Sequence, residues 1–228
     1  MSKGRYFMGR TMATVGVKGV ARLGLVVVLL VTGLLVAAPS AQALTFDLTS
    51  DHCDPACGPQ ASFGTVTLTQ NGANVDVTVH LLNGNQFVKT GSADFQDFKF
   101  NATGVALADI TVDAHVPALV AATGAFNGDG TGAFAFGITC PSCGNGGAGA
   151  FSTDIVFHVA NATIADLTAP NNLGIVFVAD ILSGSNGNTG PVDATTPTTP
   201  TPEPASTALL GLSLFGIGLV AALRRKKA

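Results

Sequence analysis

The sequence has no tryptophan, and its only tyrosine, Tyr6, lies near the N-terminus. Sugar-binding sites usually stack sugar rings on tryptophan or tyrosine, so the common platform for carbohydrate recognition is missing. Between Leu44 and Thr201 there is also no arginine and no glutamate. A glycosidase needs two carboxyl groups, and here both would have to come from aspartates.

Positive charge is almost absent from the same region. It holds two lysines, Lys89 and Lys99, against thirteen aspartates, a net charge of −11, whereas the whole chain has a formal charge of −3. The other basic residues lie near the two ends of the chain. Such an acidic segment should repel nucleic acid and anionic lipid, so we expect no nucleic-acid partner. It is compatible with Ca²⁺, which binds carboxylate oxygens.

Residues 1–43 have the three parts of a secretory signal peptide. The basic residues of the first part are Lys3, Arg5, Arg10, Lys18 and Arg22, with no acidic residue among them. An apolar stretch follows at 23–38, and Ala41-Gln42-Ala43 matches a small-x-small cleavage site. The mature chain should therefore begin at Leu44. The absence of an adjacent arginine pair favours the general secretory route, with an uncleaved anchor helix as the alternative.

The C-terminus has three consecutive features. Pro202-Glu203-Pro204-Ala205-Ser206 precedes an uncharged apolar run at 207–223, and a basic cluster follows: Arg224, Arg225, Lys226 and Lys227. The apolar run is at the lower end of the roughly 17–25 residues that cross a bilayer, which predicts one transmembrane helix. The basic cluster should remain cytoplasmic.

This tail resembles the sorting signal of PEP-CTERM proteins, the exosortase substrates of Gram-negative bacteria that make extracellular polysaccharide. The resemblance covers residues 202–228, and Thr201 stands where the family often has valine. It implies export, transient anchoring in the inner membrane, and cleavage near Pro202-Glu203-Pro204 by an exosortase. The product would reach the cell surface or the biofilm matrix. A tail anchor without processing is the alternative.

Between the two signals, residues 44–182 alternate apolar and polar side chains and show no amphipathic helix. We predict an all-β ectodomain, an antiparallel β-sandwich of about eight strands. The clearest hairpin joins 63–69 to 75–81 through a loop of about five residues, and a second joins 81–82 to 86–88. The other expected strands are 98–100, 134–138, 155–159 and 175–179.

Residues 183–201 change in composition. A Gly/Ser/Asn-rich stretch at 183–190 is typical of a flexible segment, and a Thr/Pro run begins at Thr195. Proline stiffens an extended chain, so we expect a linker that lifts the domain from the membrane.

The four cysteines form two close pairs, Cys53 with Cys57 and Cys140 with Cys143. Export makes disulfides the expected state, and proximity favours pairing within each pair. Pairing between the two would close a loop of over eighty residues and stabilise by about 4–5 kcal/mol. Two alternatives remain: a zinc site that adds His52, and a redox pair at 140–143.

Other candidate sites are weaker. Asn127 and Asp129, in Asn-Gly-Asp-Gly, are possible Ca²⁺ ligands but also fit a plain turn. His80, His115 and His158 are scattered, and His80 and His158 fall in expected strands. Asp97 is interpreted as an ordinary loop acid.

The sequence therefore predicts a non-enzymatic exported surface or matrix protein associated with extracellular polysaccharide. Its partners would be the secretory machinery with signal peptidase, an exosortase, the membrane before processing, and the polysaccharide. No cofactor is expected, with calcium as the one candidate. A carbohydrate- or calcium-binding surface module is the alternative, and a secreted hydrolase that uses aspartates is a third hypothesis.

Overall fold

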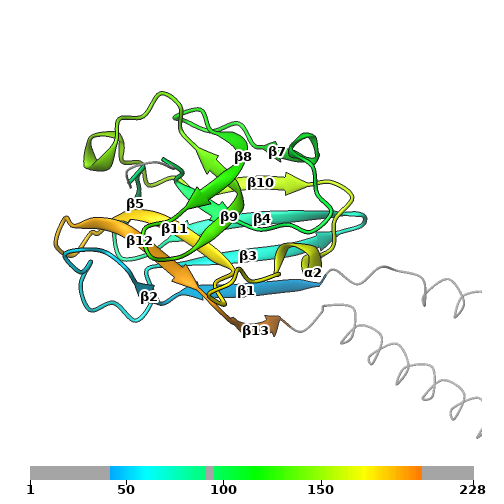
Figure 1. Cartoon of the computed structure of the whole chain (residues 1–228), viewed down its shortest axis with the longest axis horizontal. Helices are drawn as coiled ribbons and strands as arrows, with labels where there is room; N and C mark the ends of the chain where they lie inside the picture. The colour runs from blue at the N-terminus through cyan, green and yellow to red at the C-terminus, as the bar shows by residue number, and fades with distance from the viewer. Residues whose placement is uncertain (1–41, 91–94, 202–228) are drawn as a thin grey trace, which may run out of the picture. The chain divides into compact units, whose positions relative to one another are not determined.

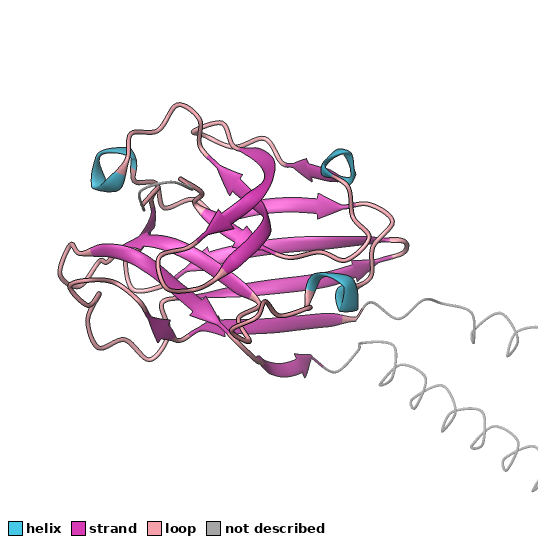
Figure 2. Ribbon diagram, in the orientation of Figure 1, coloured by secondary structure: helices cyan, strands magenta, loops and turns pink. Residues whose placement is uncertain are grey.

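Antiparallel strands form almost all of the regular secondary structure in a computed structural model that describes residues 42–90 and 95–201 (Figures 1 and 2). The first sheet has the order β13 (Pro197–Thr201), β1 (Ala43–Leu48), β3 (Gly64–Asn71), β4 (Asn74–Leu81), β10 (Ile155–Val159), β7 (Ile110–Val112). The second has the order β2 (Ser50–Asp51), β12 (Thr189–Ala194), β11 (Phe177–Leu182), β6 (Phe98–Phe100), β9 (Ala133–Thr139), β8 (Val120–Asn127), with β5 (Gln86–Phe87) also paired to β11. Short helical turns are η1 (Leu107–Asp109), η2 (Gly146–Gly149) and α2 (Ile164–Leu167). The predicted all-β, antiparallel class is confirmed, with more strands than expected.

Phenylalanine rings fill the space between the two sheets. Phe46 of β1 meets Phe177 of β11 edge to face, with ring centroids 5.0 Å apart. Phe157 of β10 likewise contacts Phe98 and Phe100 of β6, at 6.1 and 5.1 Å. All five rings are at most 1% exposed. The second sheet lies across the first (Figure 1), and these contacts join the two layers into a sandwich with one main core.

The first expected hairpin is confirmed, with a tighter turn than expected. β3 and β4 pair up to Asn71 opposite Asn74, which leaves only Gly72 and Ala73 in the turn. Gly72 has a φ of 62°, a conformation that favours glycine.

The second expected hairpin is wrong. Phe87 of β5 pairs with Ile181 of β11, in the other sheet. Its ring is fully buried and stacks on Phe151 at 5.3 Å, so burial of the ring directs this segment away from β4. The strand expected at 175–179 is also shifted and begins at Phe177.

The linker expected at 183–201 is wrong as well, because this segment completes both sheets. β12 pairs with β11 along its whole length, and Val192 and Ala194 are fully buried in the core. β13 pairs with β1 at the edge of the first sheet. Its prolines are tolerated there because an edge strand leaves one row of backbone groups unpaired.

The two ends of the described chain meet at one sheet edge, where Ala43 of β1 pairs with Thr201 of β13 (Figure 1). Within residues 42–90 and 95–201, no helix is long and apolar enough to cross a membrane. The predicted leader up to Ala41, the sorting motif, the apolar run and the basic cluster lie outside the described residues.

Candidate functional site

Both disulfides form within the close cysteine pairs, as predicted. Cys53 bonds to Cys57 and Cys140 to Cys143, with Cα atoms 5.5 and 5.3 Å apart. The sulfurs are therefore not thiolates, so the zinc alternative loses its ligands. A disulfide at 140–143 is also the oxidised state of a redox pair, but the pair is followed by the short turn η2 and not by the helix that a thioredoxin-type motif precedes. Two disulfides also indicate an oxidising compartment, in agreement with export.

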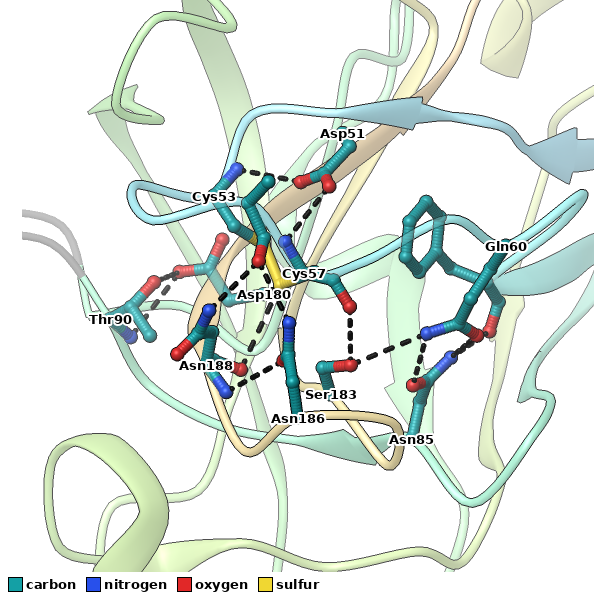
Figure 3. Close-up of a disulfide and its surroundings, with 12 residues drawn as sticks. Asp51, Cys53, Cys57, Gln60, Asn85, Thr90, Asp180, Ser183, Asn186 and Asn188 are labelled. Carbon is teal, nitrogen blue, oxygen red and sulfur yellow. Dashed lines mark hydrogen bonds between the residues drawn. A yellow bond between two sulfur atoms is a disulfide. The ribbon is translucent and has the colours of Figure 1, made fainter.

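The loop closed by the first disulfide is held by polar side chains from the segment expected to be flexible (Figure 3). Ser183 Oγ donates to Cys57 O at 2.6 Å, and Ser185 Oγ donates to the same oxygen at 2.9 Å. Asn186 and Asn188 both donate their side-chain amides to Ala56 O. We call residues 53–57 and 183–188 together the disulfide clamp. Its serines and asparagines satisfy backbone carbonyls, so a composition typical of linkers here forms an ordered loop.

Both lysines of the described chain are buried, and Lys99 lies on the outer face of the second sheet, the face turned away from the main core. Lys99 is 1% exposed and Lys89 8%. Lys99 Nζ lies 2.8 Å from Asp180 Oδ1, and neither side chain is more than 2% exposed. Among residues 42–90 and 95–201, no lysine or arginine is therefore exposed at the surface, whereas most aspartates reach solvent. The charge facing solvent is almost entirely carboxylate.

Asp97 is a buried acid beside this ion pair, so its interpretation as a loop acid is wrong. It is fully buried, and Oδ2 accepts a hydrogen bond from Cys140 N at 2.7 Å. Burial raises the pKa of this carboxyl from 3.8 to about 6, helped by the charge of Asp180. The Cys140 hydrogen bond and the two lysines partly oppose that rise. We call Lys89, Asp97, Lys99 and Asp180 the buried charge cluster.

The histidines bind neighbouring groups and do not gather into one site. His158 and His80 lie on the outer face of the first sheet, and His80 Nδ1 is 2.7 Å from Asp154. His158 faces a carboxylate on each side, Asp76 at 2.7 Å and Asp113 at 2.9 Å. The hydrogen bond to Asp76 is the main reason why the pKa of His158 is raised, because two acceptors favour the doubly protonated ring.

His115 and His52 lie elsewhere. His115 is bound to Pro117 O and to Thr153 Oγ1, both at 2.7 Å. His52 Nε2 lies 2.5 Å from Asp193 Oδ2, so it is engaged by a buried carboxylate.

The calcium candidates lie in the turn between β8 and β9. Asn127 ends β8, and both Asn127 and Asp129 are exposed. The turn is closed from within, because the backbone N–H and the hydroxyl of Thr131 both donate to Gly128 O. In the described chain, the one tight group of acidic and sulfur side chains is Asp51 with Cys53 and Cys57. Its carboxylate already accepts hydrogen bonds from both cysteine N–H groups.

A hollow of about 560 Å³ lies beside α2 and the start of β1, and its described lining residues are Gln42, Leu44, Gln70, Gly72, Thr163, Ile164, Ala165 and Thr168. None of these is aromatic. The Gln70 amide donates to the carbonyls of Gly72, Asn74 and Ala162, so it is not available to a ligand. The hydroxyls of Thr163 and Thr168 are likewise bonded, to Asp166 and to Ala165 O, and the described lining offers no aromatic stacking platform.

Few of the predicted signal residues fall in the described chain. Ala43, the residue before the expected leader cleavage, is the first residue of β1 and pairs with both Thr69 and Thr201. β13 ends at Thr201, immediately before Pro202. Outside the described residues lie Ala41, the motif Pro202-Glu203-Pro204 and the basic residues 224–227.

Sequence reasoning did not find the buried charge cluster. One signal was available: in Phe98-Lys99-Phe100, one of the two lysines between Leu44 and Thr201 stands between two core rings. In a strand whose alternate residues face the core, that lysine must point to the opposite face. Its burial there depends on loops that cover the face, which periodicity does not reveal.

No protein-family model, curated protein or solved structure matches this chain.

Proposed function

We propose that this chain is an exported, non-enzymatic surface protein that an exosortase sorts into the extracellular polysaccharide or biofilm matrix. The observation that carries the proposal is the tail: the Pro-Glu-Pro motif, the apolar run and the basic cluster in that order. General secretory machinery and signal peptidase would act on the leader, and the exosortase would act near Pro202-Glu203-Pro204.

The fold is compatible with cleavage at that motif. Every described strand precedes Pro202, so removal of the tail would leave both sheets complete. The folded domain also reaches the motif without the spacer that we had expected, since β13 ends at Thr201. β13 is an edge strand with one neighbour, so it can separate from β1 without disturbing the rest of the sheet. An exosortase that needs an extended substrate would require such local opening.

The surface supports a role in a hydrated matrix. With both lysines buried, the solvent-facing charge is carboxylate, which favours solubility and suppresses self-association. Two disulfides stabilise the loops in an oxidising environment. The described histidines are engaged with carboxylates or backbone groups, an arrangement that serves structure.

Fractionation of the producing cell tests the proposal. The wild-type protein should be recovered with the polysaccharide, whereas a chain with Glu203→Ala and Pro204→Ala should remain in the membrane at its full length. The matched control is Thr196→Ala, an exposed position before the motif, which should be sorted like the wild type. Equal distribution of the motif variant and the wild type would contradict sorting. Polysaccharide cleavage by the purified protein would contradict the non-enzymatic role.

A further inference from the structure

Three titratable side chains from neighbouring strands share one face of the second sheet. Lys99 of β6 lies opposite Val178 of β11. Two residues earlier, Asp97 O accepts a hydrogen bond from Asp180 N at 3.0 Å, which continues the same antiparallel pairing. Residues opposite each other, and those one diagonal step away, share a face of the sheet. Asp180 therefore has Asp97 opposite it and Lys99 as its diagonal neighbour.

The lysine amine and the carboxyl of Asp180 are held together in a site closed to water. Nζ and Oδ1 are 2.8 Å apart, and both side chains are at most 2% exposed. The turn after β8 covers the lysine, because a Cβ built on Gly128 would lie 3.4 Å from Lys99 Nζ. A buried ion pair carries a large desolvation cost, and a neutral product formed from the two groups would avoid that cost. Two reactive groups fixed in contact also react with a high effective concentration.

The other oxygen of Asp180 is held by two donors. Thr90 Oγ1 donates to Oδ2 at 2.7 Å, and Thr90 N–H donates to the same atom at 3.3 Å (Figure 3). If Cγ of Asp180 became tetrahedral, negative charge would develop on Oδ2. Preorganised donors at that atom stabilise such a charge.

We propose that Lys99 and Asp180 become joined by an amide bond between Nζ and Cγ, with the release of one water molecule. One proton passes from Nζ to Oδ1 across their hydrogen bond, which leaves a neutral amine beside a carboxylic acid. The amine lone pair attacks Cγ, and the π electrons move to Oδ2 between the Thr90 donors. Nitrogen then loses a second proton, Oδ1 gains one and departs as water, and the carbonyl re-forms at Oδ2.

Asp97 is placed to move the protons of the last step. Its Oδ2 is held by Cys140 N–H, whereas its buried Oδ1 has no hydrogen-bond partner among the described residues. Because burial raises its pKa to about 6, this carboxyl can both give and take a proton near neutral pH. It gives a proton to the departing Oδ1 and receives one from the nitrogen, so it ends unchanged. The reaction needs no cofactor, oxidant or second protein, and it does not depend on how the chain is sorted.

Peptide mapping of the full chain, recovered from its producing cell, tests the bond. After denaturation, reduction and alkylation, trypsin has only two sites between Leu44 and Thr201, Lys89 and Lys99. With the amide present, trypsin cuts after Lys89 but not after Lys99. The peptide 90–99 is then missing, and the fragment that contains both Lys99 and Asp180 is lighter by one water. Recovery of the free peptide 90–99 in full yield, with no water lost, overturns the proposal.

Three variants locate the bond. Lys99→Arg keeps a tryptic site but has no nucleophilic amine, so cleavage after residue 99 and the full mass should both return. Thr196→Ala, at an exposed position outside the buried charge cluster, is the control, and it should leave the water loss and the uncut Lys99 unchanged. Asp97→Asn should lower the bonded fraction in freshly made protein. If the water loss instead maps to Asp129-Gly130, where a cyclic imide also releases water, and Lys99 is cut, the proposal fails.

Discussion

Replacement of Ser183 by alanine tests whether the disulfide clamp is part of the fold. Ser183 is 2% exposed, and its Oγ donates to Cys57 O at 2.6 Å. The same oxygen accepts longer hydrogen bonds from Ser185 N at 3.2 Å and from Gln60 Nε2 at 3.3 Å. Ser185 Oγ still donates to Cys57 O in the variant, so that carbonyl keeps one donor. Gln60 Nε2 also keeps its hydrogen bond to Asn85 Oδ1. The loss is therefore mainly that of the bonds to Cys57 O and from Ser185 N, each worth about 0.5–1.5 kcal/mol. We expect the free energy of unfolding to fall by about 1–2 kcal/mol.

Urea unfolding of the mature protein, with disulfides intact, measures this change. Thr196→Ala is the matched control, because Thr196 is exposed and lies in the same stretch that the composition assigns to a linker. Exposed substitutions of this kind usually change stability by less than about 0.5 kcal/mol. If Ser183→Ala changes the midpoint no more than Thr196→Ala does, residues 183–188 are not held as described.

Three further predictions concern the core and two titrating groups. Phe177→Ala should lower the free energy of unfolding by about 3–5 kcal/mol in urea, since it removes a fully buried ring; a loss below about 1 kcal/mol would contradict the packing. The raised pKa of His158 means that its contact with Asp76 stabilises the fold below about pH 6.5. This stabilisation should fade as pH rises through the raised pKa, and melting curves of His158→Gln should lack that change. The pKa of Asp97 is raised from 3.8 to about 6, so the folded state holds this proton more tightly than the unfolded state. As the pH rises from about 4 to about 6, the free energy of unfolding should therefore fall, by at most about 3 kcal/mol. In a Lys99→Arg background, where no amide forms, Asp97→Asn should remove that fall; an unchanged pH profile would show that Asp97 is not the group responsible.

Strand periodicity in the sequence predicts much of the sandwich. β3 and β4 alternate apolar with polar residues, and the structure buries the apolar residues of both strands: Val66, Leu68, Val75, Val77, Val79 and Leu81. The disulfide pairing is also predictable from the sequence, because cysteines three or four residues apart can bring their Cα atoms within disulfide reach.

The failures share a physical cause, which is long-range contact. Residues 183–190 look like a linker because Ser, Gly and Asn favour turns, yet here their side chains bind a loop more than a hundred residues away. Phe87 leaves its expected hairpin because its ring is buried against Phe151. Lys99 and Asp180 are 81 positions apart, so no local pattern connects them.

The mass of the intact protein recovered from the cell surface tests the central claim most directly. The proposed function predicts a chain that begins at Leu44 and ends near Pro204, which removes the leader and the tail together. A chain that extends to Ala228 would contradict sorting and identify an ordinary membrane-anchored protein.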